Sequence, residues 1–262
     1  MIYLNLYKLF EIFREIIFPL ARILPIISLT PIFGENFVNK RVKILISVLL
    51  SIFYINVSAT NFYINLFSNE GFLILFQQIF IGLFLGFVIY MVFSIPVIVG
   101  EIISLQIGLS FSTIFDVSQK WNSSVFSYFI KIFFLMVFLS LNGHYWIIYT
   151  IFNSFSLIPI ENLHFSKNAF FLILYFFSKV FLRGVIIVFP IMIPVLALNI
   201  MMAILNRTIP QFSVFSIFLP MLLLISLFIF YFCVPININN FNLFLKNMFE
   251  KINNFNKNTI FY

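Results

Sequence analysis

The chain has 262 residues, of which 63% are hydrophobic and only 9% are charged, and its formal net charge is +7. A soluble domain carries about 25% charged residues, and a single water-exposed domain cannot hide this much apolar side chain in its core. The composition therefore excludes an ordinary soluble protein and predicts an integral membrane protein.

Long uncharged runs follow one another along the chain, and several exceed the roughly 20 residues that a helix needs to cross a bilayer. They lack the period-two alternation that is typical of barrel strands. We therefore expect an all-α, polytopic membrane protein with one domain over residues 1–262. Lysine and arginine are divided too evenly to fix its orientation. About six hydrophobic helical segments are expected, near residues 12–32, 43–62, 72–98, 124–150, 170–204 and 212–235.

The third segment carries small residues at helical spacing. Gln78, Gly82 and Gly86 are four residues apart, so they share one helix face. A Gly-x-x-x-Gly pair lets two helix backbones approach closely, and a glutamine beside it can hydrogen-bond across the contact. The pattern predicts helix packing at this face, either with another subunit or within the chain.

After this segment comes "GEIISLQIGLSFSTIFDVS" (residues 100–118), which places Glu101, Gln106 and Asp116 between two hydrophobic runs. Gly108 weakens helicity, and the serines that follow compete for backbone hydrogen bonds. Non-helical backbone at membrane depth requires surrounding protein or a water-filled cavity. The stretch is therefore either a loop or broken helix that faces a lumen or a partner, or an ordinary loop outside the membrane.

Two prolines, Pro190 and Pro194, lie inside the fifth segment. Each removes a backbone hydrogen bond and tends to kink a helix. We expect this segment to be bent, or broken into two helices that end near Asn206. Beyond it, residues 237–262 form a polar C-terminal tail that contains a short amphipathic helix near residues 244–252.

The sequence predicts no catalytic residue, no metal site and no cofactor. His144 and His164 lie in different segments, and neither a His-Glu-x-x-His motif nor a Gly-x-Ser-x-Gly motif is present. Cys233 is the single cysteine, so neither an internal disulfide nor a cysteine metal site is possible. The competing class is a stand-alone secondary transporter, in which an ionisable group inside the membrane binds a proton or an ion. Glu101 and Asp116 are the candidates for that proton site among the ionisable residues Arg22, Glu101, Asp116, Lys131 and His144.

Several ordered stretches resemble one known family, the FliR family of R subunits of the type III export gate, which includes SpaR-type relatives. The central stretch at 100–118 resembles the signature of that family. Further resemblances are "PLARILPIISLTPIFG" (19–34), "KRVKILIS" (40–47), "QQIFIGLFLGF" (77–87), "LSLNGHYWII" (139–148) and "LNRTIPQFSVFSIFLP" (205–220).

The resemblance implies a non-enzymatic subunit of the flagellar type III export gate, located in the bacterial inner membrane at the flagellar basal body. It implies a channel through which unfolded flagellar proteins pass during flagellum assembly. One such subunit assembles with P and Q subunits, while B and A export subunits complete the gate. The hydrophobic segments are then bent hairpins within that complex, in contact with membrane lipid, and no nucleic acid takes part.

The resemblance also implies roles for particular residues. The loop at about 108–120 acts as a channel plug. Our own hypothesis is that Gly108 is its hinge and that Glu101 and Gln106 anchor its base. The tripeptide Asn142–Gly143–His144 matches the family as a helix-packing element. The plug residues implied are Gly108, Leu109, Ser110, Phe111, Phe115 and Asp116.

Overall fold

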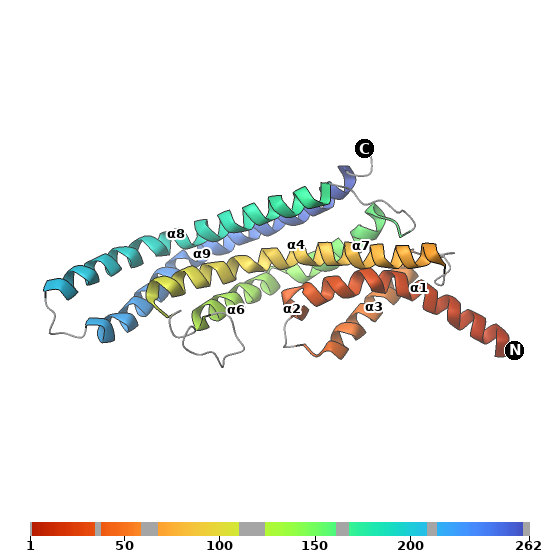
Figure 1. The fold of residues 1–262 in the computed structure, drawn as a ribbon, viewed down its shortest axis with the longest axis horizontal. Helices are drawn as coiled ribbons and strands as arrows, with labels where there is room; N and C mark the ends of the chain where they lie inside the picture. Colours follow the sequence, from red (N-terminus) through yellow and green to blue (C-terminus); the bar gives the residue numbers. More distant parts are fainter. Residues whose placement is uncertain are drawn as a thin grey trace. The chain divides into compact units, whose positions relative to one another are not determined.

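The computed structural model describes residues 2–34, 38–58, 68–109, 124–160, 168–208 and 214–258. Every element within these ranges is an α-helix, so the predicted all-α class is confirmed (Figure 1). The helices are α1 (Ile2–Leu29), α2 (Pro31–Gly34), α3 (Lys40–Ser58), α4 (Asn69–Ile107), α6 (Val125–Ser140), α7 (Gly143–Leu157), α8 (Asn168–Thr208) and α9 (Val214–Asn258).

The chain divides into two compact units. Unit 1 comprises Met1–Met91, His144–Ile173 and Phe249–Tyr262, and unit 2 comprises Val92–Gly143 and Leu174–Met248. Helices α4, α8 and α9 each contribute to both units without a break. The prediction of one domain over residues 1–262 stays a prediction.

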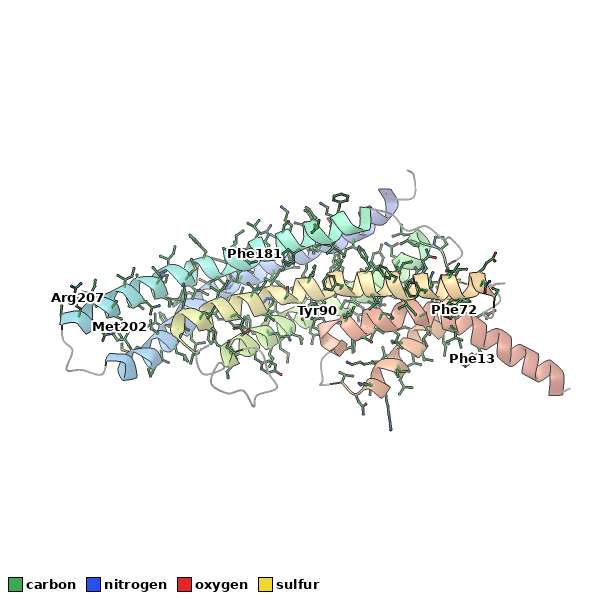
Figure 2. The ribbon with its side chains drawn as sticks, in the orientation of Figure 1. Phe13, Phe72, Tyr90, Phe181, Met202 and Arg207 are labelled. Atoms are coloured by element: carbon green, nitrogen blue, oxygen red, sulfur yellow. The ribbon has the colours of Figure 1, made fainter. Side chains whose placement is uncertain are left out.

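Within the described ranges, four helices are long and apolar enough to cross a membrane, and a fifth span results if α6 and α7 are counted as one bent segment. Much of their apolar surface is exposed; Phe181, for example, projects outward from α8 (Figure 2). These properties place the chain in the membrane, as the composition predicted. The four candidate spans are Lys40–Ser58, Asn69–Ile107, Ile173–Thr208 and Pro220–Ile252.

Four of the six expected segments have clearly different ends in the structure. Helix α1 begins at Ile2 rather than near residue 12. Helix α4 runs to Ile107, so Glu101 and Gln106 are helical, and the expectation of loop or broken helix from residue 100 is wrong for these positions. The fourth segment is divided at Leu141–Asn142 between α6 and α7. Helix α9 continues to Asn258, so the tail expected from residue 237 is helical over most of its length. Hydrophobic runs locate helices, but their ends depend on caps.

The prolines of α8 do not break it. A single helix runs from Asn168 to Thr208 and contains both Pro190 and Pro194. The predicted division into two helices is therefore not found, and kinking at these prolines stays a prediction. Proline is tolerated inside membrane helices where the surroundings satisfy the freed carbonyl groups.

Unit 1 is organised around Arg22, a fully buried side chain of α1. Its Nε donates a hydrogen bond of 2.7 Å to Oε1 of Gln78 in α4. Its two terminal nitrogens donate to the backbone oxygens of Ser154 and Ile158 at 2.8 and 2.9 Å. These carbonyls belong to the C-terminal end of α7, where the helix dipole is negative and favours a cation. The guanidinium also lies 4.3 Å from the ring centre of Phe155, so one side chain joins three helices.

The same region of α1 packs closely on the glycines of α4. A Cβ atom added to Gly82 would clash with the carbonyl oxygen of Arg22. A Cβ atom added to Gly86 would lie 3.0 Å from the side chain of Leu29. Because higher numbers in α1 meet higher numbers in α4, the two helices run parallel here, as Figure 1 shows. The contact that the Gly-x-x-x-Gly pattern predicts is thus made within the chain.

Unit 2 packs the second part of α4 against α6, α8 and α9, and aromatic rings fill the core. Phe93 of α4 meets Phe138 of α6 edge to face, with ring centres 4.8 Å apart. Phe134 of α6 meets Phe241 of α9 in the same way at 5.0 Å. Such edge-to-face pairs add to the stabilisation from burial. Gly184 of α8 lies against Ile98 of α4, so α8 also packs against α4 in this unit.

We expect Gly82→Ala to destabilise the protein and Gly184→Ala to leave it nearly unchanged. At Gly82 the new methyl group meets the rigid backbone of Arg22, whereas at Gly184 it meets only the side chain of Ile98, at 3.2 Å. Overpacking of this kind costs about 1–3 kcal/mol when the neighbour cannot move. Thermal unfolding of the detergent-solubilised protein measures the difference. Equal melting temperatures for the two variants would contradict the close packing of α1 on α4.

Candidate functional site: the frame of the central loop

The central loop leaves the described structure after Leu109 and re-enters it at Ser124. Ser110, Phe111, Phe115 and Asp116 therefore lie outside the described residues, and their assignment to a plug stays a prediction. The structure instead defines the two ends of this loop, which are the C-terminus of α4 and the N-terminus of α6. Both ends belong to unit 2.

Gly108 ends α4 in a left-handed turn. Its φ angle is 88°, a conformation that favours glycine. The N–H of Gly108 donates to the carbonyl of Leu105 at 3.2 Å, and the N–H of Leu109 donates to the carbonyl of Ser104 at 3.0 Å. This pair of bonds is the Schellman pattern that satisfies the last carbonyls of a helix. Gly108 therefore terminates α4, and the central loop follows it.

Glu101 reaches from α4 to the N-terminus of α6. Its Oε1 accepts a hydrogen bond of 2.9 Å from the backbone N–H of Ser124. Ser124 is itself the N-cap residue of α6, and its hydroxyl oxygen accepts from the N–H of Ser127 at 3.2 Å. A carboxylate beside a helix N-terminus is favoured by the helix dipole. Glu101 therefore ties the returning end of the loop to the helix from which the loop departs.

The two helices approach closely beside this link. A Cβ atom added to Gly100 would clash with Cα of Ser127. The hydroxyl of Ser127 donates to the backbone oxygen of Val97 at 3.1 Å. Such a small-residue contact with a hydrogen bond across it is typical of membrane helix pairs. The start of α6 is therefore fixed against α4 by a side-chain bond and by backbone proximity.

A third helix holds the end of α4 through Gln106. Nδ2 of Asn199 in α8 donates to the backbone oxygen of Gln106 at 2.9 Å. This oxygen lies in the last turn of α4, where carbonyls lack intrahelical partners. Oε1 of Gln106 is buried and has no hydrogen-bond partner among the described residues. The end of α4 is thus held through the backbone of Gln106, and the role of the Gln106 side chain as a loop anchor stays a prediction.

The other residues predicted for packing take part in other helix contacts. Asn142 has a φ angle of 58° and Gly143 packs against the ring of Phe138, so together they form the turn between α6 and α7. His144 is half-buried, and its ring centre lies 4.3 Å from that of Tyr145. Gln78, Gly82 and Gly86 belong to the contact between α1 and α4. The contacts that these residues make are helix-packing and turn contacts.

Sequence reasoning missed Ser124, Ser127 and Asn199 as parts of the frame. A serine directly before an apolar run is a helix-start signal, so Ser124 was detectable as an N-cap. The pairing of Ser124 with Glu101, 23 residues away in the sequence, was not. Asn199 gives no local signal, because its role depends on how α8 packs against α4.

These observations define a polytopic α-helical membrane protein whose central loop is held at both ends by helix caps and by one carboxylate. The class of protein is thus a membrane protein in which neighbouring helices fix both ends of the central loop.

The chain belongs to the bacterial export proteins, family 1, whose family model matches residues 13–248. A protein of Buchnera aphidicola subsp. Acyrthosiphon pisum called flagellar biosynthetic protein FliR is 36% identical over 262 residues, which cover the whole of both chains. The protein of the same name from Escherichia coli is 35% identical over 80% of each chain. Surface presentation of antigens protein SpaR from Shigella flexneri is 28% identical over 81% of this chain and 82% of its own. The predicted family is confirmed, and the stand-alone transporter gains no support.

We expect Glu101→Leu to destabilise unit 2 and Glu101→Gln to be tolerated. Leucine removes the acceptor for the N–H of Ser124, which is almost completely buried, and the loss of such a cap costs about 1–2 kcal/mol. Glutamine keeps an oxygen that can accept the same bond. Thermal unfolding and protease sensitivity of the purified protein test this. A Glu101→Gln variant as unstable as Glu101→Leu would show that charge, not the hydrogen bond, holds the junction.

Proposed function

We propose that this chain is a non-enzymatic subunit of the flagellar type III protein export gate. It forms part of the channel through which unfolded flagellar proteins cross the inner membrane at the basal body during flagellum assembly. The observation that carries this proposal is the 36% identity, over the whole of both chains, with a relative named for flagellar biosynthesis. The exposed apolar helices and the framed loop support a membrane component without chemistry of its own.

A flagellar role is favoured over a virulence-type role. The three proteins called flagellar biosynthetic protein FliR from Buchnera aphidicola are 36–40% identical to this chain, whereas the SpaR protein of Shigella flexneri is 28% identical. Subunits that bind each other must conserve complementary surfaces, so higher identity favours the flagellar set of partners. The proposed partners are the P and Q gate subunits, the B and A export subunits, and unfolded flagellar substrates.

The loop from Gly108 to Lys120 is proposed as the plug of this channel. A plug must leave the path of the substrate while its ends stay attached to a fixed frame. The Glu101–Ser124 bond, the close contact at Gly100 and the Asn199–Gln106 bond support such a frame. Apolar, glycine-containing segments can repack around varied side chains, which suits a channel for many polypeptides.

The test of function is restoration of export. The chain is co-expressed with its own P and Q partners in an Escherichia coli strain that lacks the corresponding three genes. Secretion of flagellar proteins into the medium is expected to return. A complex that assembles in the membrane but exports nothing would contradict the proposed function, and co-purification of tagged chain with the P subunit establishes assembly in the same cells.

In this assay, Gly108→Pro should strongly reduce export, whereas Gly108→Asn should keep most of it. Proline cannot adopt the φ angle of 88° and lacks the N–H that bonds to the end of α4. Asparagine is the residue that best replaces glycine in a left-handed helix cap. Secreted protein is measured relative to the amount of assembled complex. Export by Gly108→Pro at the level of the unmodified chain would show that the geometry of Gly108 is not needed.

A further inference from the structure

The turn between α6 and α7 requires both of the residues that form it. Asn142 has a φ angle of 58°, a left-handed conformation that asparagine adopts more readily than most residues other than glycine. A Cβ atom added to Gly143 would clash with the ring of Phe138, so a larger residue fits only if this ring moves. The geometry of the turn therefore favours the dipeptide Asn-Gly, which occurs at no other place in the chain.

The side-chain amide of Asn142 is exposed and free. The backbone N–H of Asn142 donates to the carbonyl of Leu139 at 3.0 Å, while its side chain forms no hydrogen bond with another described residue. The neighbouring Ser140 is exposed as well. A turn with exposed polar groups is not stable against hydrocarbon, so the surroundings of this turn are water or polar groups of other protein.

The backbone nitrogen of Gly143 can act as a nucleophile toward this amide. Gly143 is the first residue of α7, and the first N–H groups of a helix have no acceptor within the helix. Attack of this nitrogen on Cγ of Asn142 closes a five-membered ring, a step that is favoured because both groups belong to adjacent residues. Gly143 itself is buried, so its proton has to pass to a group of the chain.

The next residue, His144, offers an acceptor for that proton. Its Nδ1 atom is buried and has no hydrogen-bond partner among the described residues. Most buried polar atoms in proteins are hydrogen-bonded, so an orphan of this kind needs an explanation. In the tautomer that carries its proton on Nε2, the Nδ1 atom is an acceptor, and histidine is the side chain that most often serves as a general base.

We propose that Asn142 is a site of spontaneous deamidation assisted by His144. The nitrogen of Gly143 gives its proton to Nδ1 of His144 and forms a bond to Cγ of Asn142. The bond from Cγ to Nδ2 breaks, and Nδ2 takes up the proton and leaves as ammonia. Water then opens the five-membered succinimide at either carbonyl, which gives aspartate or isoaspartate. Water is the only co-reactant, and the reaction is independent of the export role proposed above.

The modification changes the turn in which it occurs. Isoaspartate carries the backbone through Cγ, so the turn gains one backbone atom, and either product gains a carboxylate. The extra atom is incompatible with the bond from residue 142 to Leu139 and with the close contact between Gly143 and Phe138. Phe138 also packs on Phe93 of α4. We therefore expect unit 2 to lose stability as the protein ages.

The test uses the full chain, purified with its P and Q partners in mild detergent and kept at growth temperature for several days. Peptides are mapped by mass spectrometry with a fragmentation method that distinguishes isoaspartate from aspartate. We expect the deamidated fraction at residue 142 to rise with time. At Asn247, an exposed residue of α9 that precedes Met248, the fraction should stay at its starting value. In His144→Gln the rate at Asn142 should fall by about a hundredfold, the lower end of what a general base contributes.

The matched control is Asn142→Gly, which suits the φ angle of 58° and has no side-chain amide. The melting temperature should fall with age in the original chain and stay constant in this variant. An equal fall in both would overturn the structural effect. A folded complex in which Asn142 reacts no faster than Asn247, or a site that reacts only after unfolding in urea, would overturn the proposal. Equal rates in His144→Gln and the original chain would overturn the role of His144.

Discussion

The packing of unit 1 depends on one buried cation. Arg22 is completely buried, and burial of an unpaired charge costs several kcal/mol. The cost is offset here by dipoles: the amide oxygen of Gln78, two carbonyls at the end of α7 and the face of Phe155. All of these partners must be present together, so α1, α4 and α7 can adopt only one relative register. The glycine at position 82 is a consequence, because α1 can reach Gln78 only if its backbone lies against α4.

In unit 2 the polar side chains bind the ends of helices, whereas in unit 1 Arg22 lies in the middle of a pair of packed helices. Glu101 supplies the acceptor that the start of α6 needs, and Asn199 supplies a donor for the end of α4. Orphan groups at helix ends must be satisfied when they are buried. The same bonds that satisfy them hold the two ends of the central loop in place. The frame thus fixes both ends of the loop that is proposed as a channel plug.

The sequence predicted the fold class, whereas the roles of its site residues stay predictions. Composition and uncharged runs are sufficient to predict membrane helices, because burial in lipid is a property of whole segments. Helix ends are set by single residues, which is why α4 extends to Ile107 and why the turn at Asn142 was missed. The Gly82–Gly86 pattern predicted a close contact but not its partner, α1. The role of Glu101 as an anchor stays a prediction, and its bond to Ser124 depends on tertiary packing that one sequence does not contain.

If the chain works as one subunit of a larger gate, the mass of the intact assembly shows this most directly. The tagged chain is expressed with its P and Q partners, extracted in mild detergent and weighed by native mass spectrometry. We predict a defined hetero-oligomer that contains one copy of this chain together with several P and Q copies. A stable, folded chain that binds neither partner would contradict the claim and would favour a protein that acts alone in the membrane.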